Sequence, residues 1–134
     1  MPEEIFSSDY QFLPRSKILS FEQINSIVKA ILPLGLKKVR ITGWEPLLRK
    51  DIIKLIKMIR SLDSDLDIAM TTNGSLLSKF IDELAGSGIN RITISLDAID
   101  EILFRDLSGN DSSDLNGIIK SIIIWSKSIR YDNF

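Results

Sequence analysis

Residues 39–51 read VRITGWEPLLRKD, and two later stretches, TTNG at 71–74 and ISLDAID at 94–100, stand in similar positions along the chain. Each lies where a short strand pattern ends and a turn or helix pattern begins. Apolar residues at helical spacing fill the segments between them. Alternating strand and helix signals predict an α/β domain whose strands run parallel.

The predicted strands have two chemically different faces. Strand patterns cover 37–42, 67–72 and 90–96, and in each the apolar residues alternate with polar ones at period two. We expect the following helices to cover the apolar face. Binding sites in parallel βα folds lie at the carboxyl ends of the strands. The polar face therefore either lines a ligand site or is open to water.

Composition narrows the class of protein. The 134 residues suffice for one domain, and 17 basic against 18 acidic residues give a formal charge of −1. This balance gives no electrostatic reason to expect nucleic acid or an anionic membrane as partner. No apolar run reaches the roughly 20 residues that cross a bilayer, and the N-terminus lacks a signal-peptide pattern. The expected location is the cytoplasm. The chain has no cysteine and no histidine.

Capping signals set the expected boundaries of the helices. Ser20 and Gln23 form a capping box at the start of the first helix. Asp97 and Asp100 are candidate caps for a turn at 101–107, and Asp114 caps a last helix that ends near residue 127. We expect residues 1–134 to form one incomplete barrel domain, with an irregular lead-in at 1–19, βα units at 20–127 and a tail at 128–134.

Several motifs together resemble one enzyme family. They are MPEE at 1–4, FLP at 12–14, ILSFEQI at 18–24, KKVRITGWEPLLRKDI at 37–52, TTNGSLL at 71–77 and GINRITISLDAID at 88–100. The chain resembles the GTP 3′,8-cyclases of molybdenum cofactor (molybdopterin) biosynthesis, which are radical S-adenosylmethionine lyases. The resemblance implies a partial (β/α) barrel, TIM-barrel-like, of which this chain supplies about three parallel βα units. The family reaction cyclises GTP to (8S)-3′,8-cyclo-7,8-dihydroguanosine 5′-triphosphate.

The resemblance also implies roles for residues at the strand ends. GTP-binding residues correspond to Arg40 and Thr71. S-adenosylmethionine-binding residues correspond to Gly43, Trp44, Glu45 and Ser95. Arg40, Thr71 and Ser95 fall on the polar strand face that the alternation predicts on its own.

The chain also departs from the family pattern. Family members carry a CxxxCxxC loop immediately before MPEE, and its thiolates hold a [4Fe–4S] cluster that binds S-adenosylmethionine. This sequence begins at MPEE, and it ends at residue 134, before the strands, the GTP-binding lysine and the second cluster region of the family. We expect a protein truncated at both ends, with no cluster and no catalysis by this chain alone. Trp44 replaces a family glycine, so its indole either points away or fills part of the pocket.

Each candidate residue also has a structural reading. Arg40 could be a solvated strand residue, and Thr71 and Ser95 ordinary hydroxyls at sheet ends. Glu45 could cap the following helix, and Trp44 could be a core aromatic. Asn73-Gly74 favours a turn in either case.

Three hypotheses about function remain open. The chain is an inactive fragment of a GTP 3′,8-cyclase, or a non-catalytic nucleotide-binding module, or a module that a companion chain complements with the missing strand and cluster. The expected ligands are GTP and S-adenosylmethionine, both bound weakly. Because an incomplete sheet leaves strand edges unpaired, we also expect self-association.

Overall fold

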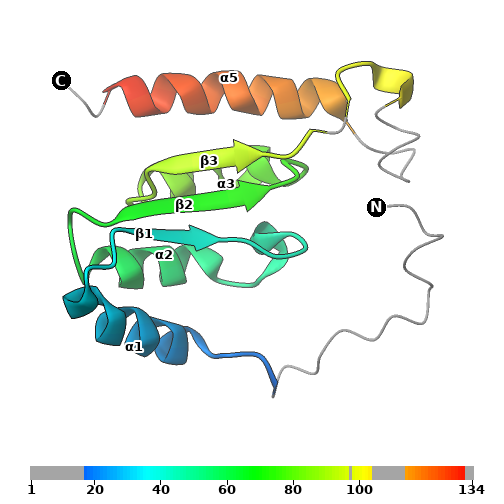
Figure 1. The fold of residues 1–134 in the computed structure, drawn as a ribbon. Coiled ribbons are helices and arrows are strands. Elements are labelled where there is room, and N and C mark those ends of the chain that lie inside the picture. The colour runs from blue at the N-terminus through cyan, green and yellow to red at the C-terminus, as the bar shows by residue number, and fades with distance from the viewer. Residues whose placement is uncertain (1–16, 97, 104–113, 132–134) are drawn as a thin grey trace.

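The fold is one parallel sheet flanked by helices. The computed structural model describes residues 17–96, 98–103 and 114–131. The sheet has the order β1-β2-β3, and all its neighbours run parallel (Figure 1). Its strands are β1 (Lys38–Ile41), β2 (Asp67–Thr72) and β3 (Arg91–Ile94). The α/β prediction is confirmed, with strands slightly shorter at the first and third positions than the sequence pattern indicates.

The helices alternate with these strands. They are α1 (Phe21–Ile31), α2 (Ile52–Arg60), α3 (Leu77–Ala85) and α5 (Leu115–Tyr131), with short 3-10 turns η2 (Leu32–Leu34) and η3 (Pro46–Leu48). In Figure 1, α2 and α3 lie behind the sheet, α1 lies on its β1 side and α5 on its β3 side. The sequence pattern does not indicate η3, because three residues are too few to show a helical period.

The core lies between the sheet and the helices behind it. Ile68 and Met70 of β2 are fully buried, and the partly buried Val39, Ile41 and Ile92 pack against the same cluster. All five stand at the alternating apolar positions of the predicted strands. Helices α2 and α3 contribute buried Ile and Leu side chains, and Trp125 of α5 joins them. The two-faced strand pattern is therefore confirmed.

Side-chain caps fix the predicted helix starts. The Ser20 hydroxyl accepts from the Gln23 N–H at 3.1 Å, and the Gln23 side chain accepts from the Ser20 N–H at 2.8 Å. Hydrogen bonds from the backbone N–H of Glu22 and from Ser20 lower the pKa of the Glu22 carboxyl. Because this pKa is lowered in the folded state, the stabilisation is present at neutral pH and is lost as the pH falls through the lowered value.

The later caps behave as expected where the structure describes them. Asp100 Oδ1 accepts from the N–H groups of Ile102 and Leu103 at 3.1 and 3.0 Å. Asp114 Oδ1 accepts from the Gly117 N–H at 2.9 Å, and α5 runs four residues beyond the predicted end. Asp97, residues 1–16 of the lead-in and most of the predicted turn at 101–107 lie outside the described residues.

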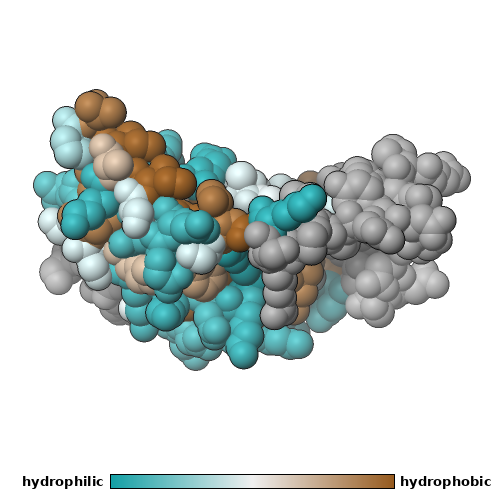
Figure 2. Space-filling view, turned by 90° about the horizontal axis from the view of Figure 1, so that it is seen from below, coloured by the Kyte–Doolittle hydropathy of each residue, from teal (hydrophilic) through white to brown (hydrophobic). Residues whose placement is uncertain are grey.

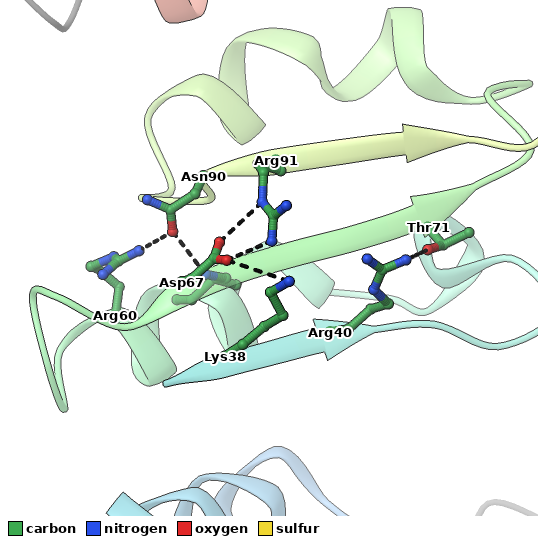
Figure 3. A network of polar contacts seen from close by, with 8 residues as sticks. Lys38, Arg40, Arg60, Asp67, Thr71, Asn90 and Arg91 are labelled. Carbon is green, nitrogen blue, oxygen red and sulfur yellow. Dashed lines mark hydrogen bonds and ion pairs between the residues drawn. The ribbon is translucent and has the colours of Figure 1, made fainter. Parts of the chain in front are cut away.

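One arginine joins three segments at the amino ends of the strands. Arg60, at the end of α2, donates to the Gly88 carbonyl from Nε and Nη2 at 3.0 and 2.8 Å. Its Nη1 donates to the carbonyls of Asp63 and Ser64 at 3.2 and 2.7 Å, and Nη2 also donates to Asn90 Oδ1 at 2.6 Å (Figure 3). Gly88 has φ +85, and a Cβ there would lie 2.7 Å from Arg60 Cγ. The loop before β2 and the turn before β3 are thus held by one guanidinium.

We expect Arg60→Met to lower the free energy of unfolding by about 2 kcal/mol, because the part-buried carbonyls of Gly88 and Asp63 lose a charged donor. Arg91→Met is the matched control. Its guanidinium pairs with Asp67 at the surface, where the two side chains are 51% and 34% exposed, so its loss should cost less than about 1 kcal/mol. Urea unfolding of both variants measures the difference. An Arg91→Met loss as large as that of Arg60→Met would contradict this ranking.

Candidate functional site: the polar face of the sheet

Two of the predicted site residues meet on the exposed face of the sheet. Arg40 of β1 extends across to β2, where its Nη1 donates to Thr71 Oγ1 at 3.4 Å (Figure 3). Arg40 is exposed and Thr71 is partly buried. Parallel register places Thr71 beside Thr93 of β3, so hydroxyls continue across the sheet toward its far edge. This face carries hydroxyl groups and a guanidinium, as the strand alternation predicts.

Ser95 follows β3 at the same end of the sheet. Its backbone N–H donates to the Thr72 carbonyl at 2.9 Å, which extends the β2–β3 pairing by one step beyond the assigned strand. The Ser95 side chain is exposed. The structure therefore places Arg40, Thr71 and Ser95 on one face, near the carboxyl ends of three adjacent strands.

Glu45 links the loop after β1 to the loop after β2. This side chain is only 6% exposed. Its Oε1 accepts from the Leu47 N–H at 3.0 Å and lies 2.8 Å from Thr72 Oγ1, and its Oε2 accepts from the Asn73 N–H at 2.8 Å and lies 2.9 Å from the same hydroxyl. Both carboxylate oxygens are therefore used within the chain. Glu45 caps the short turn η3 rather than the helix α2, whose N-cap is Asp51, and it also contacts Thr72 and Asn73.

Sequence reasoning missed Thr72, the partner of Glu45. Strand alternation places Thr72 on the same side as Ile68 and Met70, where it is 2% exposed. A buried hydroxyl on an apolar face needs a hydrogen-bond partner, so its position alone was a usable signal. Thr72 Oγ1 also accepts from the Gly74 N–H at 3.0 Å, which starts the turn after β2.

The turn at Asn73-Gly74 forms as the sequence predicts. Asn73 Oδ1 accepts from the N–H of Ser75 at 2.9 Å and from its hydroxyl at 2.7 Å. Gly74 has φ +80, and a Cβ there would lie 3.0 Å from Ile118 Cγ2 and 3.2 Å from Ile94 Cγ2. Glycine suits this position because its backbone is left-handed and because Ile118 of α5 leaves little room for a Cβ.

Gly43 and Trp44 form the loop that leaves β1. Gly43 has φ +152, and no atom lies within 4 Å of the position that a Cβ would take. A larger residue at this position is therefore disfavoured by the backbone conformation and not by a lack of space. Trp44 is 54% exposed. The reading of Trp44 as a core aromatic is therefore wrong: the indole lies at the surface of the loop, because the buried position in this loop belongs to Glu45.

The amino end of the same face carries an ion cluster. Asp67 lies between Arg91, whose Nη2 is 2.5 Å from Oδ2, and Lys38, whose Nζ is 3.8 Å from the same oxygen (Figure 3). Ala69, the next residue on this face, is 1% exposed between its register neighbours Arg40 and Arg91. These positions of the face thus hold three cationic side chains and one carboxylate, an arrangement suited to an anionic ligand.

A groove of about 770 Å³ lies elsewhere, along the outer side of α2 and next to α3. Its walls include Lys50, which precedes α2, Lys54 and Lys57 of α2, and Phe80 and Glu83 of α3. None of the predicted site residues lines it. The strand ends are the better candidate site, because the predicted polar side chains lie there and parallel sheets bind ligands at the carboxyl ends of their strands.

Similarity to known proteins gives the class to which the chain belongs. Residues 5–130 match the family model described as the radical SAM superfamily, and this match covers most of the chain. The chain belongs to the radical SAM superfamily. Its relatives include a GTP 3′,8-cyclase of Staphylococcus epidermidis, 45% identical over 111 residues, and a GTP 3′,8-cyclase of Staphylococcus aureus strain Newman, 44% identical over the same length. Each comparison covers 83% of this chain and 33% of the relative, so the chain spans about a third of their length.

The residues of this chain do not fit an iron–sulfur cluster. Such clusters are held by cysteine thiolates, with histidine as an occasional substitute. The sequence contains neither residue. In the part of the chain that the structure describes, acidic side chains do not gather in groups of three or more that could hold a metal ion. Also among these residues, no helix is long and apolar enough to cross a membrane.

Proposed function

We propose that this chain presents a GTP site of the cyclase type at the ends of its strands and carries out no radical cyclisation by itself. Arg40 and Thr71 are the GTP contacts. The observation that supports this most is the 3.4 Å contact between Arg40 Nη1 and Thr71 Oγ1 on an exposed, cationic sheet face. Among the described residues the Arg40 guanidinium donates to one neutral hydroxyl, which leaves further donors for a phosphate oxygen.

The side chains around Arg40 have distinct tasks in this proposal. The guanidinium binds an oxyanion of GTP through charge-assisted hydrogen bonds. Thr71 orients the guanidinium from the neighbouring strand. Glu45 acts as a positioning residue, because its buried carboxylate keeps the loops after β1 and β2 at a fixed separation.

S-adenosylmethionine is the poorer ligand in this proposal. Its proposed contacts are Gly43, Trp44, Glu45 and Ser95. The Glu45 carboxylate already accepts hydrogen bonds from its own chain, and the large indole of Trp44 occupies the exposed loop beside Gly43. Backbone groups of this loop and the Ser95 hydroxyl are the contacts that remain.

Calorimetric titration with GTP tests the proposal. We expect weak but measurable binding to the chain, and a loss of at least about tenfold in affinity for Arg40→Ala, because the main oxyanion contact is removed. Arg40→Lys should retain part of the affinity, since it keeps the charge without the fork of donors. Lys57→Ala, an exposed cation of α2 away from this face, is the control and should bind GTP as the parent does. Equal GTP affinity in the parent and Arg40→Ala would overturn the site.

Self-association also belongs to this proposal. In the described residues, β1 and β3 are the two edges of the sheet, and each pairs only with β2. Unpaired edges template the addition of further strands. We expect the isolated chain to associate with itself at micromolar concentration.

A further inference from the structure

The groove beside α2 is a cavity that the strand-end site does not use. Its volume of about 770 Å³ is within the range of roughly 300–1,000 Å³ that is typical of ligand sites. Buried apolar residues form part of its lining, namely Leu47, Ile52 and Ile53. Leu48, which is 67% exposed, and the partly buried Met58 and Phe80 add apolar surface that water reaches. The groove therefore offers apolar contact to a molecule that lies in it.

The α2 side of this groove is cationic. Lys50, Lys54 and Lys57 line it at the spacing i, i+4, i+7, and all three are exposed. Among the described residues, the ion pairs lie on the sheet and none includes a lysine of the groove. Glu22 of α1 attracts Lys54 electrostatically but forms no ion pair with it. Because like charges this close along a helix repel each other, Lys54 and Lys57 favour a partner that brings carboxylates.

The other charged residues of the groove limit where those carboxylates fit. The Arg49 guanidinium lies 4.4 Å from the ring centroid of Phe21 and donates to the Leu19 carbonyl, so it is engaged within the chain. Asp51 is the N-cap residue of α2, and Glu83 lines the groove from α3. The lysines thus face a wall that carries a carboxylate. This difference in charge between the two walls fixes the orientation of an occupant.

The shape of the groove favours a helix as the occupant. Helices α2 and α3 lie behind the sheet in Figure 1, and both line the groove. Two packed helices leave between them a groove that accepts the side-chain ridge of a third. An amphipathic helix binds in such a groove through its apolar stripe. Its charged border then lies beside the groove wall, where residues at the spacing of the three lysines share one helical face.

We propose that the groove between α2 and α3 docks an amphipathic helix of a different protein chain, whose apolar stripe is bordered on one side by Asp or Glu. The apolar stripe lies against Leu48, Met58 and Phe80. The carboxylates lie next to the three lysines of the groove. Neither Arg40 nor Thr71 lines the groove, so this proposal stands or falls independently of GTP binding.

A second exposed apolar area provides a control for this docking site. Figure 2, the view from below, shows apolar residues gathered at the end of the molecule where α1 and η2 lie. Ile27, Ile31 and Leu34 are 46%, 41% and 84% exposed. None of the three lines the groove. A substitution in this area should therefore leave the binding of a helix in the groove unchanged.

Two labelled helical peptides test the site on the whole chain. Both carry the same stripe of leucines, bordered on one side by Glu in one peptide and by Lys in the other. We expect the Glu peptide to bind at least about tenfold more tightly at low salt, a preference that declines toward about 1 M salt as the charges are screened. Polyglutamate has the charge without the apolar stripe and should bind more weakly than the Glu peptide. Hydrogen exchange of the α2 amides should slow when the Glu peptide is bound.

Variants locate the peptide on the chain. Lys57→Glu should weaken Glu-peptide binding about fivefold or more, because an attraction becomes a repulsion. Lys120→Glu makes the same charge change at an exposed position of α5 outside the groove and should bind nearly as the parent does. Leu48→Ser should weaken binding about threefold or more through lost apolar contact, whereas Leu34→Ser should not. Circular dichroism checks that each variant is folded.

Several results would overturn the proposal. The two peptides could bind equally well at low salt, or Lys57→Glu and Lys120→Glu could weaken binding alike. Polyglutamate that binds as tightly as the Glu peptide would show a surface that attracts any polyanion. Self-association of the chain that Lys57→Glu and Leu48→Ser abolish, but their controls do not, would make a second copy the occupant. Light scattering on the same samples identifies that case.

Discussion

Glu45→Ala is expected to lower the free energy of unfolding by about 3 kcal/mol or more, the largest stability loss among the substitutions considered for this chain. The carboxylate is buried and accepts from Leu47, Thr72 and Asn73. Removing it leaves two backbone N–H groups and one hydroxyl without their acceptor. Domains of this size are stable by only about 5–15 kcal/mol, so the change is a large fraction of the total.

A small series separates the contributions at Glu45. Glu45→Gln keeps the shape and one acceptor oxygen, and we expect an intermediate loss. Thr72→Val keeps the volume and removes the hydroxyl, so a double-mutant cycle with Glu45→Gln isolates their coupling. Urea unfolding at low protein concentration gives all four values. A loss below about 1 kcal/mol for Glu45→Ala would mean that water replaces the carboxylate and that the two loops do not depend on it.

The strands could be predicted from sequence because each has a clear alternation. Ile68 and Met70 are buried where period two places them, and Arg40 and Ser95 are exposed on the other face. The predicted and observed faces agree because successive side chains of a strand point to opposite faces, and this alternation does not depend on the rest of the fold. Helix starts followed for the same reason, since Ser20 and Gln23 satisfy each other within one turn.

The parts of the site that depend on contacts between distant segments could not be predicted. Glu45 and Thr72 lie 27 positions apart in sequence, and their pairing follows from the β1–β2 register, which no local pattern contains. Arg60 shows the same limit, because its acceptors Gly88 and Asn90 belong to a later turn. Strand alternation places Ala69 on the polar face, yet it is buried between two arginines of the adjacent strands.

The second large expected effect is the failure of this chain to bind an iron–sulfur cluster, because it lacks the residues that hold one. Radical SAM enzymes reduce S-adenosylmethionine with an iron–sulfur cluster that cysteine thiolates hold. In this chain Arg40 and Thr71 are in contact near the strand ends, and the sequence has no cysteine or histidine. Its carboxylates are dispersed in the described residues. We therefore expect this chain to bind the nucleotide but not an iron–sulfur cluster.

Anaerobic reconstitution of the purified chain with iron and sulfide tests this separation most directly. After desalting, we expect no stoichiometric iron and no cluster absorption band in the visible region. We also expect no cyclised product when GTP, S-adenosylmethionine and a strong reductant are added. The same sample should still bind GTP weakly by calorimetry. A stable brown protein with stoichiometric iron and sulfide would contradict the account.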